Sequence, residues 1–471
     1  MKNSEINNTP LAEATAKKRG GFTSKIGFVL AAAGSAVGLG NLWRFPYLAA
    51  QYGGGIFVLS YALLAVFFGL ILLMLEIGIG RHTGKSVIGA FSTLNKKFSW
   101  FGYLCVIVPL IIVPYYCVIG GWVIKYMWSF LVGSQGLVEG AGAEVNTETF
   151  FTSFISSPIE PLVFFLIFAA ITVLIVTMGV QKGIEKMSKI LMPALAIIAV
   201  FLMIYGFFQD GALEGVAYFL IPDFTKFSFK TVLGALGQLF YSLSIGMCIM
   251  ITYGSYMKKD ASIKSSSVQI AAFDSLFAII AGLIIIPAVF AFAPTADAAH
   301  KIMETNGATL MFIQISNVFN SIPGGRIIGI IFFILVFFAA VTSSVSLVES
   351  IVAVLCEDGR MKRWVACLIV FGAILVLGTL SSLGYGVLSF INIAGNSILD
   401  LFDILANNIL MPIIAIITCV VAGWFIDKNI LPKEIGIDKS KGLTRYFNIM
   451  IKYIAPICIL LILITGLFIK I

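Results

Sequence analysis

Long apolar segments separated by short polar ones dominate this chain. A helix that crosses the hydrocarbon core of a bilayer needs about 20 apolar residues at a rise of 1.5 Å each. The segments that meet this criterion are residues 24–50, 55–80, 100–131, 160–179, 188–208, 231–256, 268–294, 327–356, 364–382, 398–426 and 447–469. Hydrophobic residues make up 59% of the 471 and charged residues only 11%, which excludes an ordinary soluble domain. The sequence therefore predicts an all-α polytopic membrane protein with about eleven transmembrane helices.

Loops rich in Lys and Arg alternate along the chain with loops that hold few of them. Lys and Arg occur at residues 81–97, 182–189, 258–264, 360–363 and 428–445, whereas residues 133–158 hold three Glu and neither Lys nor Arg. Basic residues are enriched in cytoplasmic loops, and the polar first 20 residues have no signal-peptide core. We expect a multi-pass protein of the cell inner (plasma) membrane with a cytoplasmic N-terminus. An odd number of spans then predicts an extracytoplasmic C-terminus.

Two of the segments are interrupted by residues that a simple membrane helix avoids. The first contains Gly34, Gly38 and Gly40, followed by Asn41 and Arg44. Gly costs a helix about 1 kcal/mol relative to Ala, and a charged side chain in a bilayer costs several kcal/mol. The sixth segment is interrupted at residues 242–246, five spans later. Corresponding breaks in two halves of a chain are typical of inverted-repeat secondary transporters.

The glycines alone have a second interpretation. Gly34 and Gly38 have the spacing of small residues that let two membrane helices pack closely. Asn41 and Arg44 favour a binding site instead. At a broken helix, free N–H groups bind an anion such as a carboxylate, and unwound carbonyls bind a hard cation such as Na⁺.

Enzymatic and nucleic-acid functions find no support in the sequence. The seven Cys form no Cys-x-x-Cys pair, and His82 and His300 are isolated, so neither a metal cluster nor a disulfide framework is predicted. The net charge of +8 is spread over the loops rather than gathered in a patch with interleaved aromatics, which argues against nucleic acid as a partner. No nucleophile constellation or phosphate-binding loop is present, so we expect no enzymatic activity.

Three stretches resemble one known family. Residues 38–47, Gly-Leu-Gly-Asn-Leu-Trp-Arg-Phe-Pro-Tyr, closely resemble the first-helix signature of the neurotransmitter:sodium symporter family. The resemblance continues through residues 238–246 and 337–344, and order and spacing match from about residue 19 to residue 410. It implies a LeuT-type fold of two inverted five-helix repeats plus one further helix, in the bacterial amino-acid transporter branch. The implied units are a tail at 1–23, repeats at 24–208 and 209–426 with helices 1 and 6 unwound at mid-membrane, and a loop with helix 11 at 427–471.

The resemblance also implies two sodium sites. The first would use the Ala36 carbonyl, Asn41, Ser242, Asp274 and the substrate carboxylate. The second would use the carbonyls of Gly34, Val37 and Ala339 with the hydroxyls of Thr342 and Ser343. Ligand sets made only of oxygen suit a hard monovalent ion. Read without the family, the hydroxyls at 342–344 could instead bond to carbonyls one turn earlier in their own helix.

Two acidic residues within the predicted spans are relevant to whether transport requires chloride. Many relatives have Asn where this chain has Asp274, and chloride-dependent relatives need an anion nearby to balance two sodium charges. Asp274 and Glu76 would supply that negative charge, so transport is expected to be independent of chloride. Asp274 would ligate sodium directly or face it across one turn. A buried acid can instead be neutral, in which case Asp274 would also exchange protons.

The resemblance places a substrate pocket beside the first sodium site. Gly38 stands where amine transporters have Asp, which leaves room for the carboxylate of an amino acid, and Tyr116 would bond to that carboxylate. Tyr115 and Tyr116 could otherwise be ordinary core aromatics. Met247 is a flexible thioether that adapts to a large ring, which favours tyrosine or tryptophan over leucine. The expected substrate-binding residues are Ala36, Gly38, Gly40, Ile112, Tyr116, Tyr241, Ser242, Ser244, Met247, Ser343 and Leu347.

Gates are implied on both sides of this pocket. Arg44 and Asp403 would form the outer pair, with Tyr241 capping the substrate beneath them. Arg19 and Asp358 would form the inner pair, braced by Tyr256. Gly183 and Pro193 match the place where the fifth helix unwinds, although Pro193 could be a simple kink. Glu349 is expected to make a polar contact between packed helices and to have no role in transport.

The predicted function is sodium-coupled symport of a neutral, aromatic or large hydrophobic L-amino acid by alternating access, with two Na⁺ ions. The expected partners are the amino acid and membrane lipid, with no obligatory protein partner. Two alternatives on the same fold are a proton-coupled amino-acid transporter and a sodium-coupled transporter of aliphatic amino acids such as leucine. A receptor that binds without translocating is a third.

Overall fold

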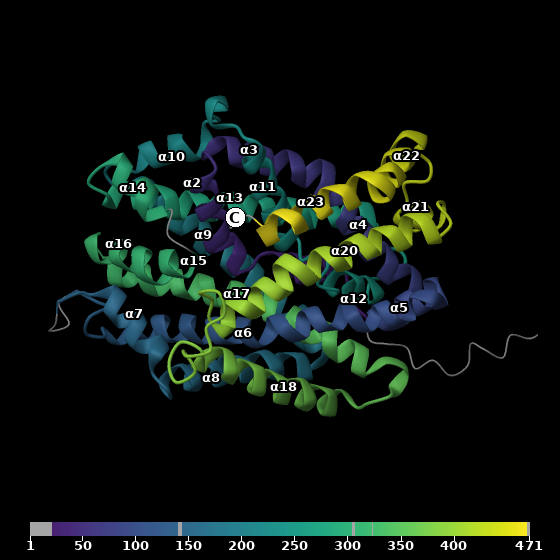
Figure 1. Ribbon diagram of the computed structural model, residues 1–471, viewed down its shortest axis with the longest axis horizontal. Coiled ribbons are helices and arrows are strands. Elements are labelled where there is room, and N and C mark those ends of the chain that lie inside the picture. Colours follow the sequence, from purple (N-terminus) through teal and green to yellow (C-terminus); the bar gives the residue numbers. More distant parts are fainter. Residues whose placement is uncertain (1–20, 140–143, 304–306, 323, 469–471) are drawn as a thin grey trace, which may run out of the picture.

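The described part of the protein consists of helices joined by turns and loops. The computed structural model describes residues 21–139, 144–303, 307–322 and 324–468. Within these ranges it has no β-sheet, only two isolated bridges, of which one joins Gly54 to Pro222. The long helices run along the longest axis of the molecule (Figure 1).

Most of the predicted spans are single long helices. Within the described residues, nine are long and apolar enough to cross a membrane. They are Gly55–Thr83, Lys96–Val132, Glu160–Thr177, Val180–Phe207, Ile263–Phe292, Gly325–Leu355, Arg363–Leu383, Ile398–Phe425 and Lys441–Gly466. Their principal helices are α3 (Gly55–Leu64), α4 (Leu70–Thr83), α6 (Ser99–Val132), α8 (Glu160–Thr177), α9 (Lys186–Phe207), α13 (Ile263–Phe292), α17 (Gly325–Leu355), α18 (Arg363–Leu383), α19 (Ile398–Asp403), α20 (Met411–Val420), α22 (Lys441–Ile449) and α23 (Ala455–Phe468).

The first and sixth spans are broken, as predicted. In the first, α1 (Lys25–Ala36) is followed by Gly40–Gln51, bent by 53° from it. This second part is a π-helical turn, Gly40–Arg44, continued by α2 (Phe45–Gln51). In the sixth, α11 (Phe229–Ser242) and α12 (Ile249–Ser255) flank the break. An all-helical membrane fold is therefore confirmed. The described residues give nine spans, or ten with the bent pair, against the eleven expected, because α11 and α12 are each too short to cross a membrane alone. The division into two repeats remains a prediction.

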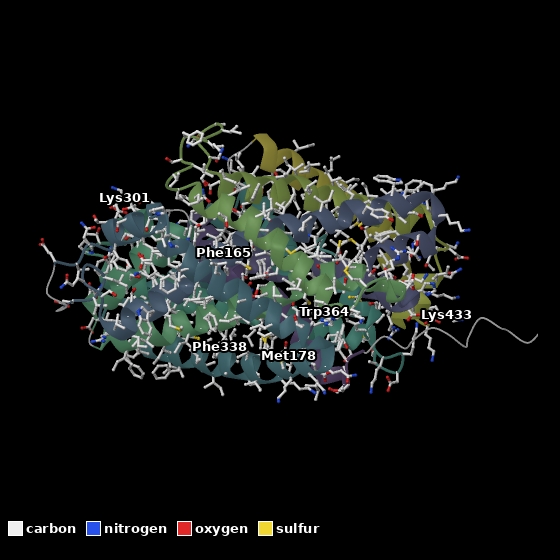
Figure 2. The ribbon with its side chains drawn as sticks, turned by 90° about the horizontal axis from the view of Figure 1, so that it is seen from below. Phe165, Met178, Lys301, Phe338, Trp364 and Lys433 are labelled. Atoms are coloured by element: carbon white, nitrogen blue, oxygen red, sulfur yellow. The ribbon has the colours of Figure 1, made fainter. Side chains whose placement is uncertain are left out.

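Short helices gather at the two ends of the molecule. The helices α7 (Thr147–Ser156), α10 (Ala212–Leu220), α14 (Ala296–Met303), α15 (Gly307–Thr309) and α16 (Ile315–Ser321) lie towards one end, and α5 (Val87–Leu94) and α21 (Ile430–Ile435) lie at the other (Figure 1). Figure 2 shows Lys301 near the first end and Lys433 near the second. Loops predicted to be outside and inside the cell therefore lie at opposite ends.

The outer surface between these ends is apolar. Met178 and Trp364 are 60% and 56% exposed there, whereas Phe165 is fully buried between helices (Figure 2). In a soluble protein such exposure would be a liability; in a bilayer these side chains face lipid.

The residue at which a membrane helix begins depends on its hydrogen-bonded N-cap as well as on the length of its apolar run. The seventh span was expected to begin at residue 268, but α13 begins at Ile263. The Ser262 hydroxyl accepts a bond from the Ser265 N–H at 3.2 Å, so the helix extends through polar residues to a serine N-cap.

One charged cluster ties together segments at the end where α21 lies. Glu434 of α21 accepts hydrogen bonds from Arg81 Nε at 2.7 Å and Lys259 Nζ at 3.1 Å. Burial, the largest influence on its pKa, opposes ionisation, but these two donors outweigh it, so the pKa of Glu434 is lowered. The carboxylate therefore stays charged and holds α21 against the ends of α4 and α12.

Candidate functional site

The break in the first span is short. The helix α1 ends at Ala36, and Val37 has an extended backbone with φ −74° and ψ 99°. The Gly38 N–H donates to the Asn41 Oδ1 at 3.3 Å, and the Asn41 N–H donates to the Gly38 carbonyl at 3.2 Å. The predicted interruption began at Gly34, but helical structure continues to Ala36. The unwound part is therefore only Val37 and Gly38, because Leu39 is again helical with φ −57° and ψ −33°, and a polar side chain stabilises it.

The break in the sixth span is longer and more strained. Residues 243–248 separate α11 from α12, and φ is positive at Ser244 (54°), Gly246 (78°) and Cys248 (65°). A positive φ at a residue other than glycine costs of order 1–3 kcal/mol and is concentrated at functional sites. Glu76 on α4 accepts a hydrogen bond from the Gly246 N–H at 2.8 Å. A buried carboxylate thus satisfies backbone that the break has freed.

The role of Glu76 yields a testable expectation. Replacement by Ala leaves the buried Gly246 N–H unpaired, which costs about 1–3 kcal/mol, so the apparent melting temperature in detergent should fall and uptake should drop. Glu76→Gln keeps an oxygen acceptor and serves as the matched control. If Glu76 acts as this acceptor, the Gln variant retains most of the stability and uptake. Equal losses in both variants would show that its charge is what matters.

Both breaks face one cavity. Its lining comprises Ser35, Ala36, Gly38, Leu39, Gly40, Asn41, Ile112, Tyr116, Tyr241, Ser244, Met247, Ile249, Ser343 and Leu347. Ten of the eleven expected substrate-binding residues are in this set; the exception is Ser242. Ser35, Leu39 and Ile249 were not foreseen, because they look like ordinary apolar or small residues of a span. The cavity is small: the volume that the centres of water molecules can occupy in it is about 30 Å³. An amino acid with a large side chain therefore fits only if the cavity walls move apart.

A buried carboxylate lies beside this cavity. Asp274 on α13 is fully buried. Its Oδ1 accepts hydrogen bonds from Asn41 Nδ2 at 2.8 Å and Ser242 Oγ at 2.7 Å, and its Oδ2 accepts one from Tyr61 Oη at 3.0 Å. Three of the four residues expected at the first sodium site therefore form one cluster, and the fourth, Ala36, lines the adjoining cavity.

The chemistry of this cluster fits a sodium ion. Within the described part of the chain, no Lys or Arg forms an ion pair with Asp274. A buried charge without a counter-charge is costly, and the oxygen atoms of Asn41, Ser242 and Asp274 are hard ligands. Tyr61 was missed from the sequence, where it looks like a core aromatic of the second span.

A second group of oxygens lies where the first span contacts α17. Ser343 Oγ is 3.3 Å from the Gly34 carbonyl oxygen, 3.2 Å from that of Ser35 and 3.3 Å from that of Val37. One hydroxyl donates to only one of three carbonyls at a time, so the arrangement leaves lone pairs for a cation. The Thr342 hydroxyl is 3.0 Å from the carbonyls of Phe338 and Ala339 in its own helix, which is the bonding raised as an alternative from the sequence. A hydroxyl that donates to a carbonyl keeps lone pairs, so the place of Thr342 at the second sodium site stays a prediction.

The hydroxyl of Ser343 can be tested directly. Ser343→Ala removes one of these oxygens, and we expect the sodium concentration for half-maximal uptake to rise about tenfold, since a hydrogen bond or ligand to a charged group contributes about 1.5–3 kcal/mol. Ser344→Ala is the matched control, because that hydroxyl faces Thr172 at 2.9 Å instead. A Ser344 variant that shifts the sodium dependence equally would contradict the assignment.

The outer gate residues lie above the cavity without forming an ion pair. Arg44 lies 5.4 Å from the centroid of the Tyr241 ring. Asp403 accepts hydrogen bonds from Tyr115 Oη at 2.9 Å and Asn407 Nδ2 at 2.5 Å. Among the described residues, no ion pair joins Arg44 to Asp403. Tyr115, named from the sequence only as a possible core aromatic, and Asn407, which the sequence did not single out, hold the carboxylate in this conformation.

The inner gate is described only in part. Arg19 lies outside the described residues, and Asp358 has a left-handed backbone with φ 55°. Tyr256 Oη donates to Glu349 Oε1 at 2.8 Å, and the Tyr256 carbonyl accepts from the Phe22 N–H at 3.1 Å. Tyr256 therefore connects the start of the first span to α17.

Two further expectations concern the same end of the molecule. Glu349 also forms an ion pair with Arg363, so it makes polar contacts between helices, as expected. Gly183 lies in a π-helical segment, Val180–Glu185, and Pro193 lies inside α9. The Glu185 carboxylate in that segment accepts from the Thr23 N–H at 2.7 Å, which fastens the start of the first span to the fifth.

Broken membrane helices around a small cavity, with a buried acid and clustered carbonyls beside it, are typical of a secondary transporter. The model of the Sodium:neurotransmitter symporter family matches residues 19–156 and 154–470. The chain is 35% identical to an uncharacterized sodium-dependent transporter of Bacillus subtilis (strain 168) over 450 residues, 94% of this chain and 96% of the relative. It is 31% identical to one of Haemophilus influenzae over 461 residues, 96% and 99% of the two chains.

A solved structure agrees with the sequence relatives. The crystal structure of MhsT in complex with L-phenylalanine superimposes with a TM-score of 0.84 at 35% identity, covering 95% of this chain and 100% of that one. The chain belongs to the sodium:neurotransmitter symporter family. It is a sodium-dependent multi-pass membrane transporter with the LeuT-type fold, and not an enzyme.

Proposed function

We propose that the protein takes up a neutral L-amino acid with an aromatic or large hydrophobic side chain, tyrosine or tryptophan before leucine, together with two sodium ions and without chloride. The observation that carries this proposal is the cavity between the two breaks, where Gly38 leaves space beside Tyr116 and Asp274 lies next to Asn41. The complex of MhsT with L-phenylalanine supports an aromatic substrate. The cavity walls named above are the proposed substrate contacts.

The proposed cycle begins with sodium at both oxygen clusters. Bound sodium holds the unwound segments in place, and the substrate carboxylate adds a ligand to the first ion. Because each ligand then favours the other, binding of sodium and amino acid is reciprocally coupled. Arg44 and Asp403 close the outside, and separation of the start of the first span from Tyr256 and Glu185 opens the inside.

The proposed orientation places α5 and α21 on the cytoplasmic side of the cell inner (plasma) membrane. It rests on the basic segments 81–97 and 428–445, which contain α5 and α21 and lie at the same end of the molecule (Figure 1). The N-terminus would then be cytoplasmic and Ile471 extracytoplasmic.

Uptake into proteoliposomes tests the proposal. Labelled tyrosine, tryptophan, phenylalanine and leucine are offered under an inward sodium gradient, with gluconate replacing chloride in a parallel set. We expect accumulation of the aromatic amino acids in both media. Accumulation driven by a pH gradient alone would favour a proton-coupled transporter, preference for leucine an aliphatic one, and binding without accumulation a receptor. A large loss of rate in gluconate would overturn chloride independence.

A further inference from the structure

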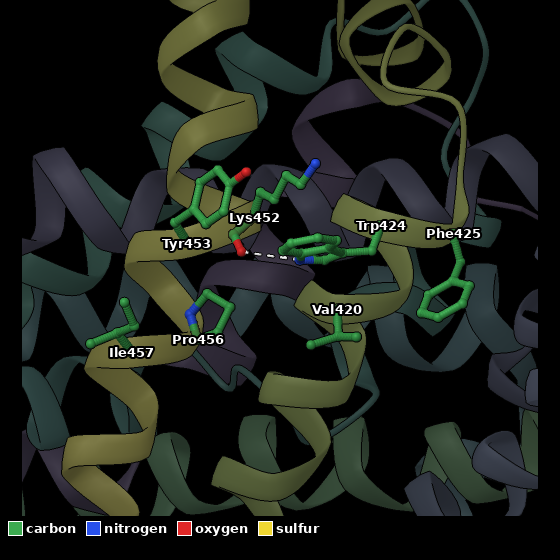
Figure 3. Close-up of a pocket in the computed structure, with 7 residues that line it drawn as sticks. All are labelled: Val420, Trp424, Phe425, Lys452, Tyr453, Pro456 and Ile457. Carbon is green, nitrogen blue, oxygen red and sulfur yellow. Dashed lines mark hydrogen bonds between the residues drawn. The ribbon is translucent and has the colours of Figure 1, made fainter.

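A second, open groove lies on the lipid-facing surface between the last two spans. It is lined in part by Val420 and Trp424 from the tenth span and by Lys452, Tyr453, Pro456 and Ile457 from the eleventh (Figure 3). We call it the Lys452 groove. Both spans are π-helical here, at Val421–Phe425 and Met450–Ile454. Widened turns of this kind occur frequently at functional sites.

Residues of both helices determine the shape of the Lys452 groove. Gly423 lets them approach closely, because a Cβ there would lie 3.0 Å from the Lys452 Cα. Pro456, four residues after Lys452, has no N–H to donate to the Lys452 carbonyl. The Trp424 indole N–H donates to that carbonyl at 3.2 Å instead, as Figure 3 shows. The indole ring is thereby fixed in orientation.

The charged ammonium group of Lys452 lies close to the Trp424 ring. Its Nζ lies 4.2 Å from the Trp424 ring centroid and 5.6 Å from that of Tyr453. In the part of the chain that the structure describes, Lys452 forms no ion pair. Trp424 and Tyr453 are 55% and 48% exposed, and exposed Trp and Tyr are typical of the membrane–water interface. The ammonium group is therefore positioned at headgroup depth, without a counter-ion among the described residues.

We propose that the Lys452 groove binds an anionic phospholipid, with the lipid phosphate at Lys452 and an acyl chain along Val420, Pro456 and Ile457. Charge complementarity selects this occupant over a neutral lipid or a second copy of the chain. The adjoining segment, residues 427–445, carries Lys428, Lys433, Lys439, Lys441 and Arg445 against Asp427, Glu434 and Asp438. A net positive segment next to the groove attracts anionic headgroups to the same leaflet. The leaflet is cytoplasmic on the proposed orientation, but binding itself does not depend on transport.

Native mass spectrometry of the purified protein tests this inference. Phosphatidylglycerol and phosphatidylcholine of equal chain length are titrated separately without sodium or amino acid, so failure of the transport proposal does not affect the result. We expect the first phosphatidylglycerol to bind about fivefold more tightly than phosphatidylcholine, the contribution of one interfacial lysine. Lys452→Gln should abolish this preference, and Lys452→Arg should retain it.

Lys428→Gln is the matched control, because it removes the same charge from an exposed position outside the groove. It should keep the preference. Equal loss in the Lys428 and Lys452 variants would overturn the proposal in favour of diffuse attraction. So would an unchanged preference in Lys452→Gln, no preference in the unmodified protein, or a dimer that dissociates when the groove is altered. Lys452 is partly exposed, and unchanged melting of the variants confirms that they are folded.

Discussion

Asp274→Asn should reduce sodium-driven uptake at least about tenfold in chloride-free medium. The substitution preserves shape but removes the charge of a fully buried side chain that accepts bonds from Asn41, Ser242 and Tyr61. Interactions with a charged group contribute about 1.5–3 kcal/mol, which corresponds to a factor of ten or more. The measurement is the initial uptake rate against sodium concentration, in gluconate and in chloride.

Chloride should restore part of the uptake in this variant, because an added anion replaces the lost negative charge. Tyr61→Phe is the control: it removes one donor to Asp274 and keeps the charge, so its loss should be smaller and insensitive to chloride. Uptake by Asp274→Asn at the unmodified rate in gluconate would show that this carboxylate does not balance sodium.

Gly38→Asp should abolish amino-acid uptake. A Cβ at this position would lie 2.8 Å from Ser343 Oγ and 3.1 Å from Tyr116 Oη, and the added carboxylate would fill the space assigned to the carboxylate of the substrate. It would also repel that group in a buried site, where like charges interact strongly. We expect a loss of at least about 100-fold in apparent affinity, by analogy with other unpaired buried charges. Competition binding with labelled amino acid in saturating sodium measures it.

Gly38→Ala separates size from charge. It introduces the same Cβ, to which the rotatable Ser343 hydroxyl can adjust, so its loss should be much smaller than that of the Asp variant. Equal losses would mean that the position requires glycine only for packing, which is the alternative raised by its spacing from Gly34. Full activity of Gly38→Asp would refute the carboxylate position.

Features that depend on a single stretch of chain were predictable. The spans follow from apolar runs longer than a bilayer requires, and the breaks follow from Gly34, Gly38 and the run at 242–246. The errors are of the same local kind. The first break is narrower than expected, and α13 begins five residues early because Ser262 caps it.

Features that depend on contacts between distant residues were not predictable from the residues themselves. Tyr61 and Asp274 are 213 positions apart, and Tyr115 and Asp403 are 288 apart. Each tyrosine looks like an ordinary core aromatic until its partner is known. Resemblance to a family named Asp274 and Asp403, but it did not name the residues that hold them in place.

The sequence by itself determined that this chain crosses a membrane, where two of its helices break, and which oxygen-bearing residues are available at the breaks. Hydropathy, glycine and polar residues within a helix act on their own stretch of chain, so their effects can be predicted from the sequence alone. Only the tertiary structure decided that Glu76 accepts a hydrogen bond from the broken sixth span, that the Ser343 hydroxyl lies beside three carbonyls of the first, and that Trp424 fixes a groove at Lys452. Each of these depends on which helices pack together, and buried polar groups find their partners only when the helices meet.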